Sequence, residues 1–458
     1  MTGQGWRPHG AVAVVGVGVM GEAVARALSA RGHRVVLVDD RPAPRHDALA
    51  AELGAAFHPA PAHGDDAAWD AVLDEVTAFL PTPGLPERHP AFAAARRRGL
   101  PTISEFDLAA AWDDRPLVAI TGTNGKTTVT MMVTAMIERS GRRAAAVGNT
   151  DVPLVAALDD PDTELFVVEA SSFRLGHSAR FRPVVATWLN FAPDHLDVHT
   201  DLAAYETAKA RIWADQQASD TAVGNLDDPV VADHLATATA RRIGFSVTPA
   251  AAVVPGRYGV AGGVLHDDEG RPLLAVGDLP RALPHDIANA LAAIATAVAA
   301  GADRAASVEV VRTWRQLPHR VQLVAEARGL RFYDDSKATT PHATLAALSG
   351  FERAVLIAGG QNKGIDLTPL RQAAAGLRAV VAIGAAAAEV AAVFAGAVPV
   401  VEVTTCMDDA VAAAAAIAEP GDAVVLSPAC ASFDWYRNYG ERGDDFARAA
   451  LAWTEGPR

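Results

Sequence analysis

The chain has 458 residues, a length that suggests about three domains rather than one core. Its 40 Lys and Arg residues against 54 Asp and Glu residues give a formal charge of −14, and half of the residues are hydrophobic. This composition is typical of a folded, soluble protein. It disfavours intrinsic disorder and predicts neither nucleic acid nor anionic lipid as a partner.

The two cysteines, Cys406 and Cys430, cannot build a disulfide framework or a cysteine-based metal cluster. Such sparse cysteine usage favours a reducing compartment, so we expect a cytoplasmic protein. The most apolar long stretch, Ala290 to Ala302, is shorter than the 18 or so residues that a membrane span requires. The sequence therefore predicts no transmembrane helix and no membrane partner.

Short β-rich runs alternate with alanine-rich helical stretches along the chain. Continuous apolar strands separated by helices indicate parallel sheets covered on both faces, so the predicted fold class is doubly wound α/β. Such sheets bind ligands at the carboxyl ends of their strands. The predicted strands are Ala11–Val15, Val35–Val38, Leu117–Ile120, Leu165–Val168, Val184–Trp188, Ala354–Ile357, Val380–Ile383 and Ala423–Leu426.

Two polar, proline-containing turns mark candidate domain boundaries. Trp112–Pro116 precedes a new strand, and Gln316–Pro318 follows a helix that contains Asn289. Between them, the loop-rich stretch Pro249–Gly277 predicts a small β excursion. The predicted domains are residues 1–112, 113–316 and 317–458.

A first glycine loop, with Gly16, Gly18 and Gly21 in a G-x-G-x-x-G pattern, joins strand Ala11–Val15 to a predicted helix. Glycines permit a tight turn and a close backbone approach, and the helix N-terminus offers N–H groups to a pyrophosphate. Asp39, at the end of the next strand, completes the pattern of a dinucleotide site. By itself this loop predicts NAD binding, so an NAD-dependent oxidoreductase is one alternative.

A second loop, Thr-Gly-Thr-Asn-Gly-Lys-Thr-Thr at 121–128, also lies between a strand and a helix. Ile120 stands where the strict P-loop pattern has glycine, but the working parts are kept. Backbone amides can cradle phosphates, Lys126 can neutralise the β- and γ-phosphate oxygens, and Thr127 can ligate Mg²⁺. We therefore predict an ATP site. Its predicted residues are Gly122, Thr123, Asn124, Gly125, Lys126, Thr127 and Thr128.

Three further side chains lie in positions that suit metal-assisted chemistry. Glu169 ends a strand, where a second Mg²⁺ ligand belongs, although a buried Glu there can also be a structural hydrogen-bonding group. His195 follows the end of the next predicted strand, which favours a metal role over a structural one. Lys209 lies in a helix that begins near Leu202, four residues after Tyr205, and its spacing alone predicts an ordinary solvated lysine.

Together these motifs resemble the Mur ligase family, in family order and over essentially the whole chain. The segments 121–128, 169–173, 194–197 and 205–209 are shared with folylpolyglutamate synthetases, so they indicate the type of reaction but not the amino acid that is added. Asp-Asp-Ser-Lys-Ala-Thr and Leu-Ser-Pro-Ala-Cys-Ala-Ser-Phe-Asp resemble the glutamate-adding branch. The matching segments are 121–128, 169–173, 194–197, 205–209, 317–320, 334–339 and 426–434.

The resemblance implies three domains: an N-terminal Rossmann-like domain, a central P-loop ATPase with a mostly parallel sheet, and a C-terminal Rossmann-like domain. The first glycine loop would then hold the diphosphate of a UDP-sugar rather than NAD. The implied reaction is ATP-dependent addition of D-glutamate to UDP-N-acetylmuramoyl-L-alanine through an acyl phosphate, in cytoplasmic peptidoglycan precursor synthesis. We expect a monomer. The sequence leaves open D- or L-glutamate and the base that deprotonates its amine.

The resemblance also implies the roles of individual residues. One Mg²⁺ would lie between Thr127, Glu169 and the ATP phosphates, and a second at His195 and Lys209. CO₂ would convert the Lys209 amine into a carbamate, an anion that suits hard Mg²⁺. Lys126, Glu169, His195 and Lys209 are thus the predicted catalytic set. The remaining predicted contacts are Asn289, Arg320, Asp335 and Lys337 for ATP, Gly18, Val19, Met20, Asp40, Thr82 and Asn149 for the UDP-sugar, and Thr339, Lys363, Ser432 and Tyr439 for glutamate.

Three positions depart from the family pattern. Asp286 replaces a usual Asn, Val321 and Gln322 follow the His-Arg motif, and Asp40 stands where a neutral group is expected near uracil. None of these changes removes a phosphate, metal or glutamate group. The alternatives are a sister ligase for another amino acid, including L-glutamate, an NAD-dependent oxidoreductase, and a non-catalytic nucleotide-binding scaffold.

Overall fold

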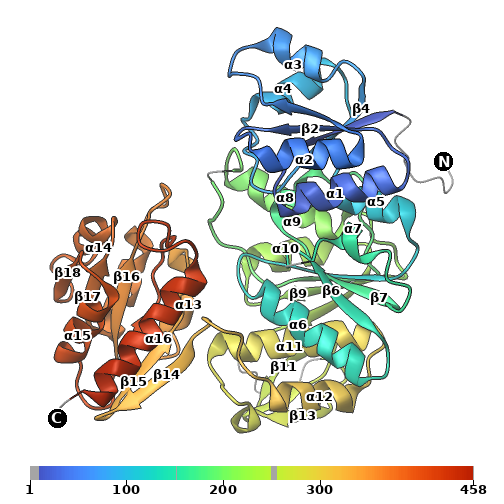
Figure 1. Ribbon diagram of the computed structural model, residues 1–458. Helices are drawn as coiled ribbons and strands as arrows, with labels where there is room; N and C mark the ends of the chain where they lie inside the picture. Colours follow the sequence, from blue (N-terminus) through green and yellow to red (C-terminus); the bar gives the residue numbers. More distant parts are fainter. Residues whose placement is uncertain (1–9, 151, 197, 249–254, 457–458) are drawn as a thin grey trace. The chain divides into compact units, whose positions relative to one another are not determined.

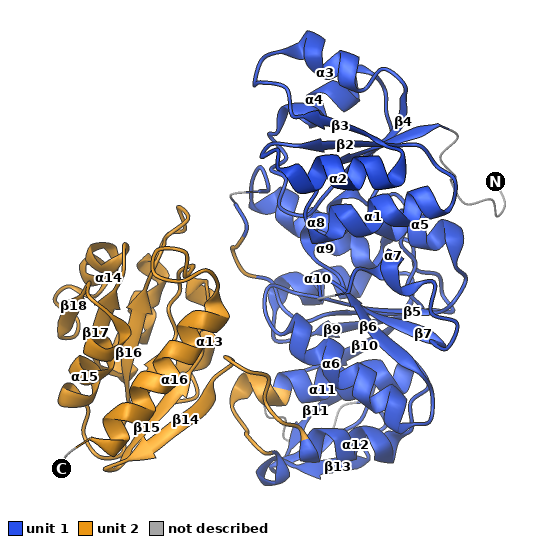
Figure 2. Ribbon diagram, in the orientation of Figure 1, with its two compact units in different colours: residues 1–191, 195–279, 288–313 blue, residues 192–194, 280–287, 314–458 orange. Residues whose placement is uncertain are grey.

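The computed structural model describes residues 10–150, 152–196, 198–248 and 255–456. The chain forms two compact units, coloured separately in Figure 2. Three sheets, two in the first unit and one in the second, confirm the predicted three-part α/β fold class. The boundaries near 112 and 316 stay predictions. Unit 1 comprises residues 1–191, 195–279 and 288–313, and unit 2 comprises residues 192–194, 280–287 and 314–458.

The first sheet is parallel, in the order β3-β2-β1-β4, and helices cover both of its faces (Figure 1). Val12 and Val14 pack toward helices α1 and α2, whereas Ala13 and Val15 pack toward α3 and α4. Alternation of side chains along a strand explains why so apolar a run is needed. The elements are β1 (Ala11–Val15), α1 (Val19–Ala30), β2 (Val35–Asp39), α2 (Pro44–Leu53), β3 (Ala56–Pro59), α3 (Asp66–Val72), β4 (Val76–Pro81), α4 (Pro90–Arg97) and α5 (Glu105–Trp112).

The second sheet has the order β13-β12-β11-β10-β9-β8-β5-β7-β6 and is parallel except where β12 pairs with β11 and β13. This antiparallel end confirms the β excursion for the described part of 249–277. Residues 249–254 lie outside the described residues. The strands are β5 (Leu117–Thr121), β6 (Ala144–Gly148), β7 (Leu165–Glu169), β8 (Val185–Trp188), β9 (Thr221–Asn225), β10 (Arg241–Phe245), β11 (Arg257–Ala261), β12 (Val264–His266) and β13 (Pro272–Ala275). The helices are α6 (Lys126–Arg139), α7 (Leu154–Ala157), α8 (Ser172–His177), α9 (Leu202–Ala214), α10 (Pro229–Thr237), η1 (Val276–Asp278), α11 (Pro284–Ala299) and α12 (Arg304–Thr313).

The third sheet has the order β14-β15-β19-β16-β17-β18, with one antiparallel strand, β14, at its edge. Val355 and Ile357 pack against α15 and α16, and Ala354 and Leu356 face the opposite layer. The elements are β14 (Gln322–Ala327), β15 (Leu330–Asp334), α13 (Pro341–Leu348), β16 (Ala354–Gly359), η2 (Thr368–Gly376), β17 (Leu377–Ile383), α14 (Ala387–Phe394), β18 (Val400–Val403), α15 (Met407–Ile417), β19 (Ala423–Leu426) and α16 (Tyr439–Glu455).

All eight predicted strands are present, with ends displaced by three residues or fewer. Over the residues that the structure describes, no helix combines the length and apolarity needed to cross a membrane.

Candidate active site

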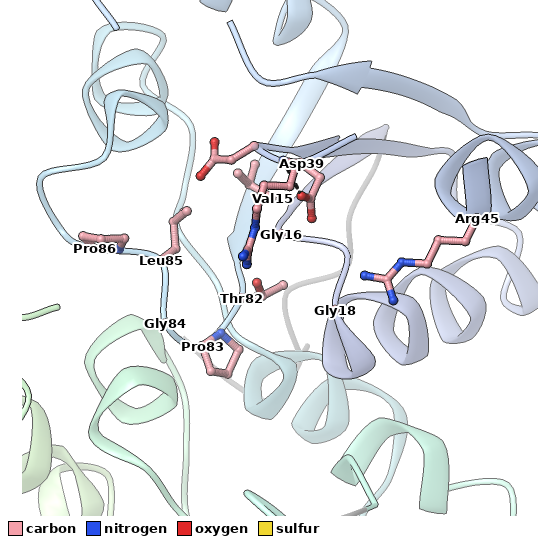
Figure 3. Close-up of a pocket in the computed structure, with 12 residues that line it drawn as sticks. Val15, Gly16, Gly18, Asp39, Arg45, Thr82, Pro83, Gly84, Leu85 and Pro86 are labelled. Atoms are coloured by element: carbon pink, nitrogen blue, oxygen red, sulfur yellow. Dashed lines mark hydrogen bonds between the residues drawn. The ribbon is translucent and has the colours of Figure 1, made fainter. Parts of the chain in front are cut away.

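The first glycine loop borders a cavity of about 550 Å³ at the carboxyl end of the first sheet (Figure 3). Gly16 has φ +99°, and a Cβ there would collide with the Thr82 hydroxyl. A Cβ on Gly21 would collide with the Gly16 carbonyl, so both positions require glycine. Gly18 differs, because its φ is −84° and a Cβ would meet no atom within 4 Å. The backbone at Gly18 is therefore open toward the cavity.

Four charged side chains line this cavity: Asp39, Asp40, Arg41 and Arg45. Asp39 accepts hydrogen bonds from the Val17 and Arg41 amides at 2.7 and 2.8 Å, and Asp40 lies 3.0 Å from His89 Nε2. In the described part of the chain, neither Arg41 nor Arg45 forms an ion pair with a carboxylate. The carboxylates are thus engaged locally while two guanidinium groups remain for an anionic ligand.

Only part of the predicted UDP-sugar set borders the cavity. Gly18, Asp40 and Thr82 line it. Val19 begins α1 with its side chain 77% exposed, and Met20 is buried in the core of the first sheet, so neither side chain lines the cavity. Asn149 lies at another strand end, beside Glu169. Arg41 and Arg45 were absent from the predicted set because isolated arginines carry no motif.

The second glycine loop follows β5 and packs tightly on its surroundings. Gly125 has φ +83° and begins α6, and a Cβ there would lie 2.7 Å from Asn289 Oδ1. The Asn124 amide donates to Asn190 Oδ1 at 2.8 Å. Lys126 Nζ donates to the Gly122 and Thr123 carbonyls at 2.9 Å each. The loop, its lysine and the predicted ATP residue Asn289 are thus brought together in unit 1, with Thr127 and Thr128 in the first turn of α6.

Glu169 ends β7, the strand directly beside β5. Its side chain is 2% exposed, and Oε1 accepts a hydrogen bond of 3.0 Å from Asn149 Nδ2. Its other oxygen, Oε2, is buried and has no hydrogen-bond partner among the described residues. A buried carboxylate oxygen left without a donor suits a hard cation such as Mg²⁺.

Lys209 is buried, contrary to the solvated lysine that its spacing alone predicts. Its side chain is 1% exposed, Nζ donates to the Gly122 carbonyl at 2.8 Å, and Nζ lies 4.6 Å from the centre of the Tyr205 ring. Tyr205 in turn lies 3.2 Å from the Thr123 hydroxyl. Helix α9 therefore brings Lys209 against the phosphate loop, through tertiary packing that sequence spacing does not reveal.

His195 adopts φ +56° and lies among aromatic rings, 4.7 Å from Phe173 and 5.9 Å from Tyr205 between ring centres. His195 and Lys209 thus both contact Tyr205. Within the described ranges, no three His, Cys, Asp or Glu side chains are grouped so as to hold a metal ion. A magnesium centre here would therefore depend on phosphate oxygens, Thr127 and a modified Lys209 in addition to Glu169 and His195.

In unit 2, three neighbouring parallel strands, β15, β19 and β16, lead at their carboxyl ends into the loops that carry Asp335, Lys337, Thr339, Ser432 and Lys363. Asp335 follows β15 directly, is 6% exposed, and accepts hydrogen bonds from Ser427 Oγ and the Val321 amide. Burial raises the pKa of Asp335 to about 7, although these donors and Arg320 oppose the shift. Arg320 is half-buried in the preceding loop.

The predicted glutamate residues lie on the same edge. Lys337 Nζ is 3.8 Å from the centre of the Tyr439 ring, and exposed Lys363 has its Nζ 5.0 Å from the ring of Phe433. Ser432 is buried and begins a turn in which its carbonyl accepts the Tyr436 amide at 2.8 Å. Thr339 lies in the same loop as Lys337, half-buried.

All three departures from the family pattern have structural partners, and the partner of Asp40 is His89, as described above. Asp286 forms a two-pronged ion pair with Arg281, at 2.6 and 2.7 Å. Gln322 accepts the His319 amide at 3.2 Å, and His319 Nδ1 lies 2.6 Å from Asp334. Asp286, in the first turn of α11, is thus tied to the segment before that helix, and Gln322, at the start of β14, to the loop before that strand.

Arg442, on α16, was not predicted from the sequence. It is 1% exposed and donates to the carbonyls of Ser336, Cys430 and Ala431 and to the Ser336 hydroxyl, at 2.9–3.2 Å. No ion pair with a carboxylate is formed by Arg442 in the described part of the chain, and burial lowers its pKa to about 10. It joins the loop after β15 to the loop after β19, where the predicted ATP and glutamate residues lie.

A parallel strand that runs into a Gly-Lys-Thr-Thr loop and a helix defines a P-loop nucleotide-binding protein. The Mur ligase middle domain matches residues 120–297, and the glutamate ligase domain of Mur ligases matches residues 319–430. The NAD-binding domain of 6-phosphogluconate dehydrogenase matches residues 11–82.

Relatives named UDP-N-acetylmuramoylalanine–D-glutamate ligase match nearly the whole chain. The Frankia casuarinae protein is 46% identical over 96% of this chain and 94% of its own, and the Thermobifida fusca protein is 38% identical over 96% and 98%. The chain belongs to the Mur ligase family.

Solved structures agree on the fold. A pseudomurein peptide ligase type C from Methanothermus fervidus has a TM-score of 0.58 at 16% identity and covers 97% of this chain and 100% of its own. MurF ligase from Thermotoga maritima in complex with ADP has a TM-score of 0.58 at 15% identity, with 92% and 95% covered.

Proposed function

We propose that the protein is an ATP-dependent ligase that forms an amide bond between UDP-N-acetylmuramoyl-L-alanine and D-glutamate. The observation that carries the proposal is the 46% identity over 96% of the chain with a D-glutamate ligase. The glycine loop with Lys126, the buried Glu169 and the strand-end residues of unit 2 supply the groups that this reaction requires. We further propose that it acts in the cytoplasm as a monomer, in peptidoglycan precursor synthesis and therefore in cell division. Light scattering on the purified protein tests the monomer.

The chemistry has two steps. A carboxylate oxygen of the UDP-sugar forms a bond to the γ-phosphorus of ATP, and ADP leaves. The glutamate nitrogen then attacks the resulting acyl phosphate, loses a proton, and phosphate leaves as the C–O bond breaks. Amides of residues 122–128 and Lys126 would hold the phosphates, and residues of unit 2 would bind glutamate.

The donor set fits Mg²⁺, which would neutralise charge on the phosphates and on the attacking carboxylate. Thr127 and Glu169 would hold one ion, because Glu169 Oε2 is buried without a hydrogen-bond partner among the described residues. His195 and a carbamate on Lys209 would hold a second. Burial of the Lys209 amine against the phosphate loop supports the carbamate, since water is kept from it.

The main experiment measures ADP release with UDP-N-acetylmuramoyl-L-alanine and Mg²⁺, offering D-glutamate, L-glutamate, meso-diaminopimelate or L-alanine. Release with D-glutamate alone is expected. Release only with another amino acid would keep the ligase chemistry and overturn the glutamate pocket, and release with none would overturn the function.

The carbamate is tested separately by depleting CO₂. Activity should fall when buffers are freed of CO₂ and return on addition of bicarbonate, and ¹³C-bicarbonate should give a carbamate carbon signal that K209R lacks. Activity and spectra that ignore CO₂ would remove the carbamate while leaving the ligase reaction in place.

An NAD-dependent oxidoreductase remains the alternative that the match to an NAD-binding domain favours. In such a domain the acidic residue after the second strand receives a ribose hydroxyl. Here Asp39 already accepts two backbone amides. Calorimetric titration with NAD should therefore show no tight binding, whereas micromolar binding would revive that alternative.

A further inference from the structure

A three-residue hydrogen-bonded bridge connects the cavity of the first sheet to the phosphate-binding edge of the second. His199, 2% exposed, lies with Nδ1 2.8 Å from Glu87 Oε1 and Nε2 2.9 Å from Ser172 Oγ. A neutral imidazole satisfies both contacts by donating from Nδ1 to the carboxylate and accepting at Nε2 from the hydroxyl.

One end of the bridge, Glu87, lies in the loop after β4, which we call the cavity loop because residues 82–86 line the cavity. Leu85 and Pro86 line the cavity, and Glu87 is the next residue (Figure 3). The Glu87 amide donates to the Val198 carbonyl at 2.9 Å, and its carboxylate accepts the Thr200 amide at 2.9 Å and the Thr200 hydroxyl at 2.8 Å. The segment that carries His199 thus holds both the backbone amide and the carboxylate of Glu87.

The other end of the bridge, Ser172, lies just after β7, the strand that ends at Glu169. Ser172 begins α8 three residues after Glu169, and Phe173, the next residue, stacks on the His199 ring with an interplanar angle of 17°. Phe173 also contacts His195. All of these residues are in unit 1, so the bridge spans two sheets of one compact body.

We propose that Glu87, His199 and Ser172 are positioning residues that hold the cavity loop in register with the strand end of Glu169. This inference rests on the proposed function and deepens it, because the acceptor carboxylate bound from the cavity side must meet the γ-phosphate in line. A displacement of about 1 Å between reacting groups can cost about 10²-fold in rate. The bridge would thereby keep the two binding regions at a fixed separation.

The test compares H199F with the parent enzyme. Phenylalanine keeps the stack on Phe173 and removes both hydrogen bonds. We expect kcat to fall by about 10-fold to 10²-fold, while the dissociation constants of ATP and of the UDP-sugar, each measured alone by calorimetry, stay nearly unchanged. A purely structural residue would instead weaken binding together with the melting temperature.

S172A, which removes one hydroxyl, is the second variant and should lower kcat in the same way to a smaller extent. The matched control is H234F, because His234 also pairs with a carboxylate, Glu206 at 2.9 Å, and packs on Trp188 rather than on a residue of the bridge. H234F should keep the parent kcat.

A double-variant cycle completes the test. E87A combined with H199F should be no slower than the slower single variant, because each breaks the same connection. Unchanged kcat in H199F and S172A, or fully multiplicative losses in the double variant, would overturn the bridge. An inactive parent enzyme would instead overturn the proposed function, and the bridge with it.

Discussion

The two glycine loops of unit 1 each join a buried parallel strand to a helix, yet they obtain positive charge from different places. The loop after β5 carries its own cation, Lys126, folded onto the carbonyls of Gly122 and Thr123. The loop after β1 has none, and its cavity instead receives Arg45 from α2, along with Arg41. A glycine pattern therefore supplies amides and space in both cases, and the two loops differ in the source of their cation.

The side chains that hydrogen-bond to the backbones of the two loops also differ. The β1 loop is held by a carboxylate, Asp39, that accepts the Val17 amide. The β5 loop is held by an amide, Asn190, that both accepts from and donates to the Asn124 backbone. A carboxylate near any phosphate group repels it unless its charge is engaged by donors or a cation, and the charge of Asp39 is engaged by two backbone amides.

The largest effect is expected from K126A. Loss of the ammonium group that lies within the β5 loop should lower kcat by about 10³-fold, since charge stabilisation by a positioned donor supplies about this factor. ADP release measures it, and R139A, at the far end of the same helix, is the control. A decrease in kcat of less than tenfold would mean that Lys126 is not the main source of positive charge for the β5 loop.

A pair of alanine substitutions compares the two loops directly. G125A forces a positive φ on alanine and places its Cβ against Asn289, so the KM for ATP should rise at least about tenfold. G18A enters open space at an ordinary φ, so the fold should be unaffected while the KM for the UDP-sugar rises. Equal effects of both variants on ATP would contradict separate ligands.

The positions of eight of the strands depend on local signals that the sequence carries well. Strands such as Ala354–Gly359 are buried on both faces and consist of unbroken runs of apolar residues, so their positions could be predicted. β3 (Ala56–Pro59) and β14 (Gln322–Ala327) were not predicted, because both are edge strands with mixed burial. Edge strands need only half of the apolar pattern, which leaves too weak a signal.

The site was predictable where chemistry and backbone coincide, as in Lys126 and Glu169 at strand ends. Residues that reach the site from other elements could not be predicted from motif spacing, and Lys209 was included in the predicted site only through the family resemblance. Lys209 reaches the β5 loop from α9, Arg442 reaches two loops of unit 2 from α16, and His199 links two sheets. Their roles arise from helix packing, and helix packing is not encoded in the spacing of a motif.

R45A tests whether Arg45, on α2, supplies positive charge to the ligand bound at the β1 loop. Loss of a charge-assisted hydrogen bond worth about 1.5 kcal/mol should raise the KM for the UDP-sugar about tenfold without changing the KM for ATP. Arg45 stands in the first turn of α2, where a cation opposes the helix dipole, so its removal should also stabilise the fold by about 0.3 to 1 kcal/mol. R34A, an exposed arginine outside the cavity lining, is the control. Weakened stability with unchanged KM would make Arg45 structural.

The smallest effect is expected from D39N, which tests how the β1 loop is supported. An asparagine can keep one of the two acceptor contacts and places an N–H₂ group against a backbone amide at the other, so the free energy of unfolding should fall by about 1 to 2 kcal/mol. Because the loop keeps its glycines, the KM for the UDP-sugar should rise only a few-fold by the affinity scale, and the KM for ATP should not change. Urea unfolding and ADP release measure the two quantities in the same preparation. If D39N instead abolished ligand binding at unchanged stability, Asp39 would contact the ligand itself, as the acidic residue of an NAD site does. The source of the cation would then not explain the difference between the two glycine loops.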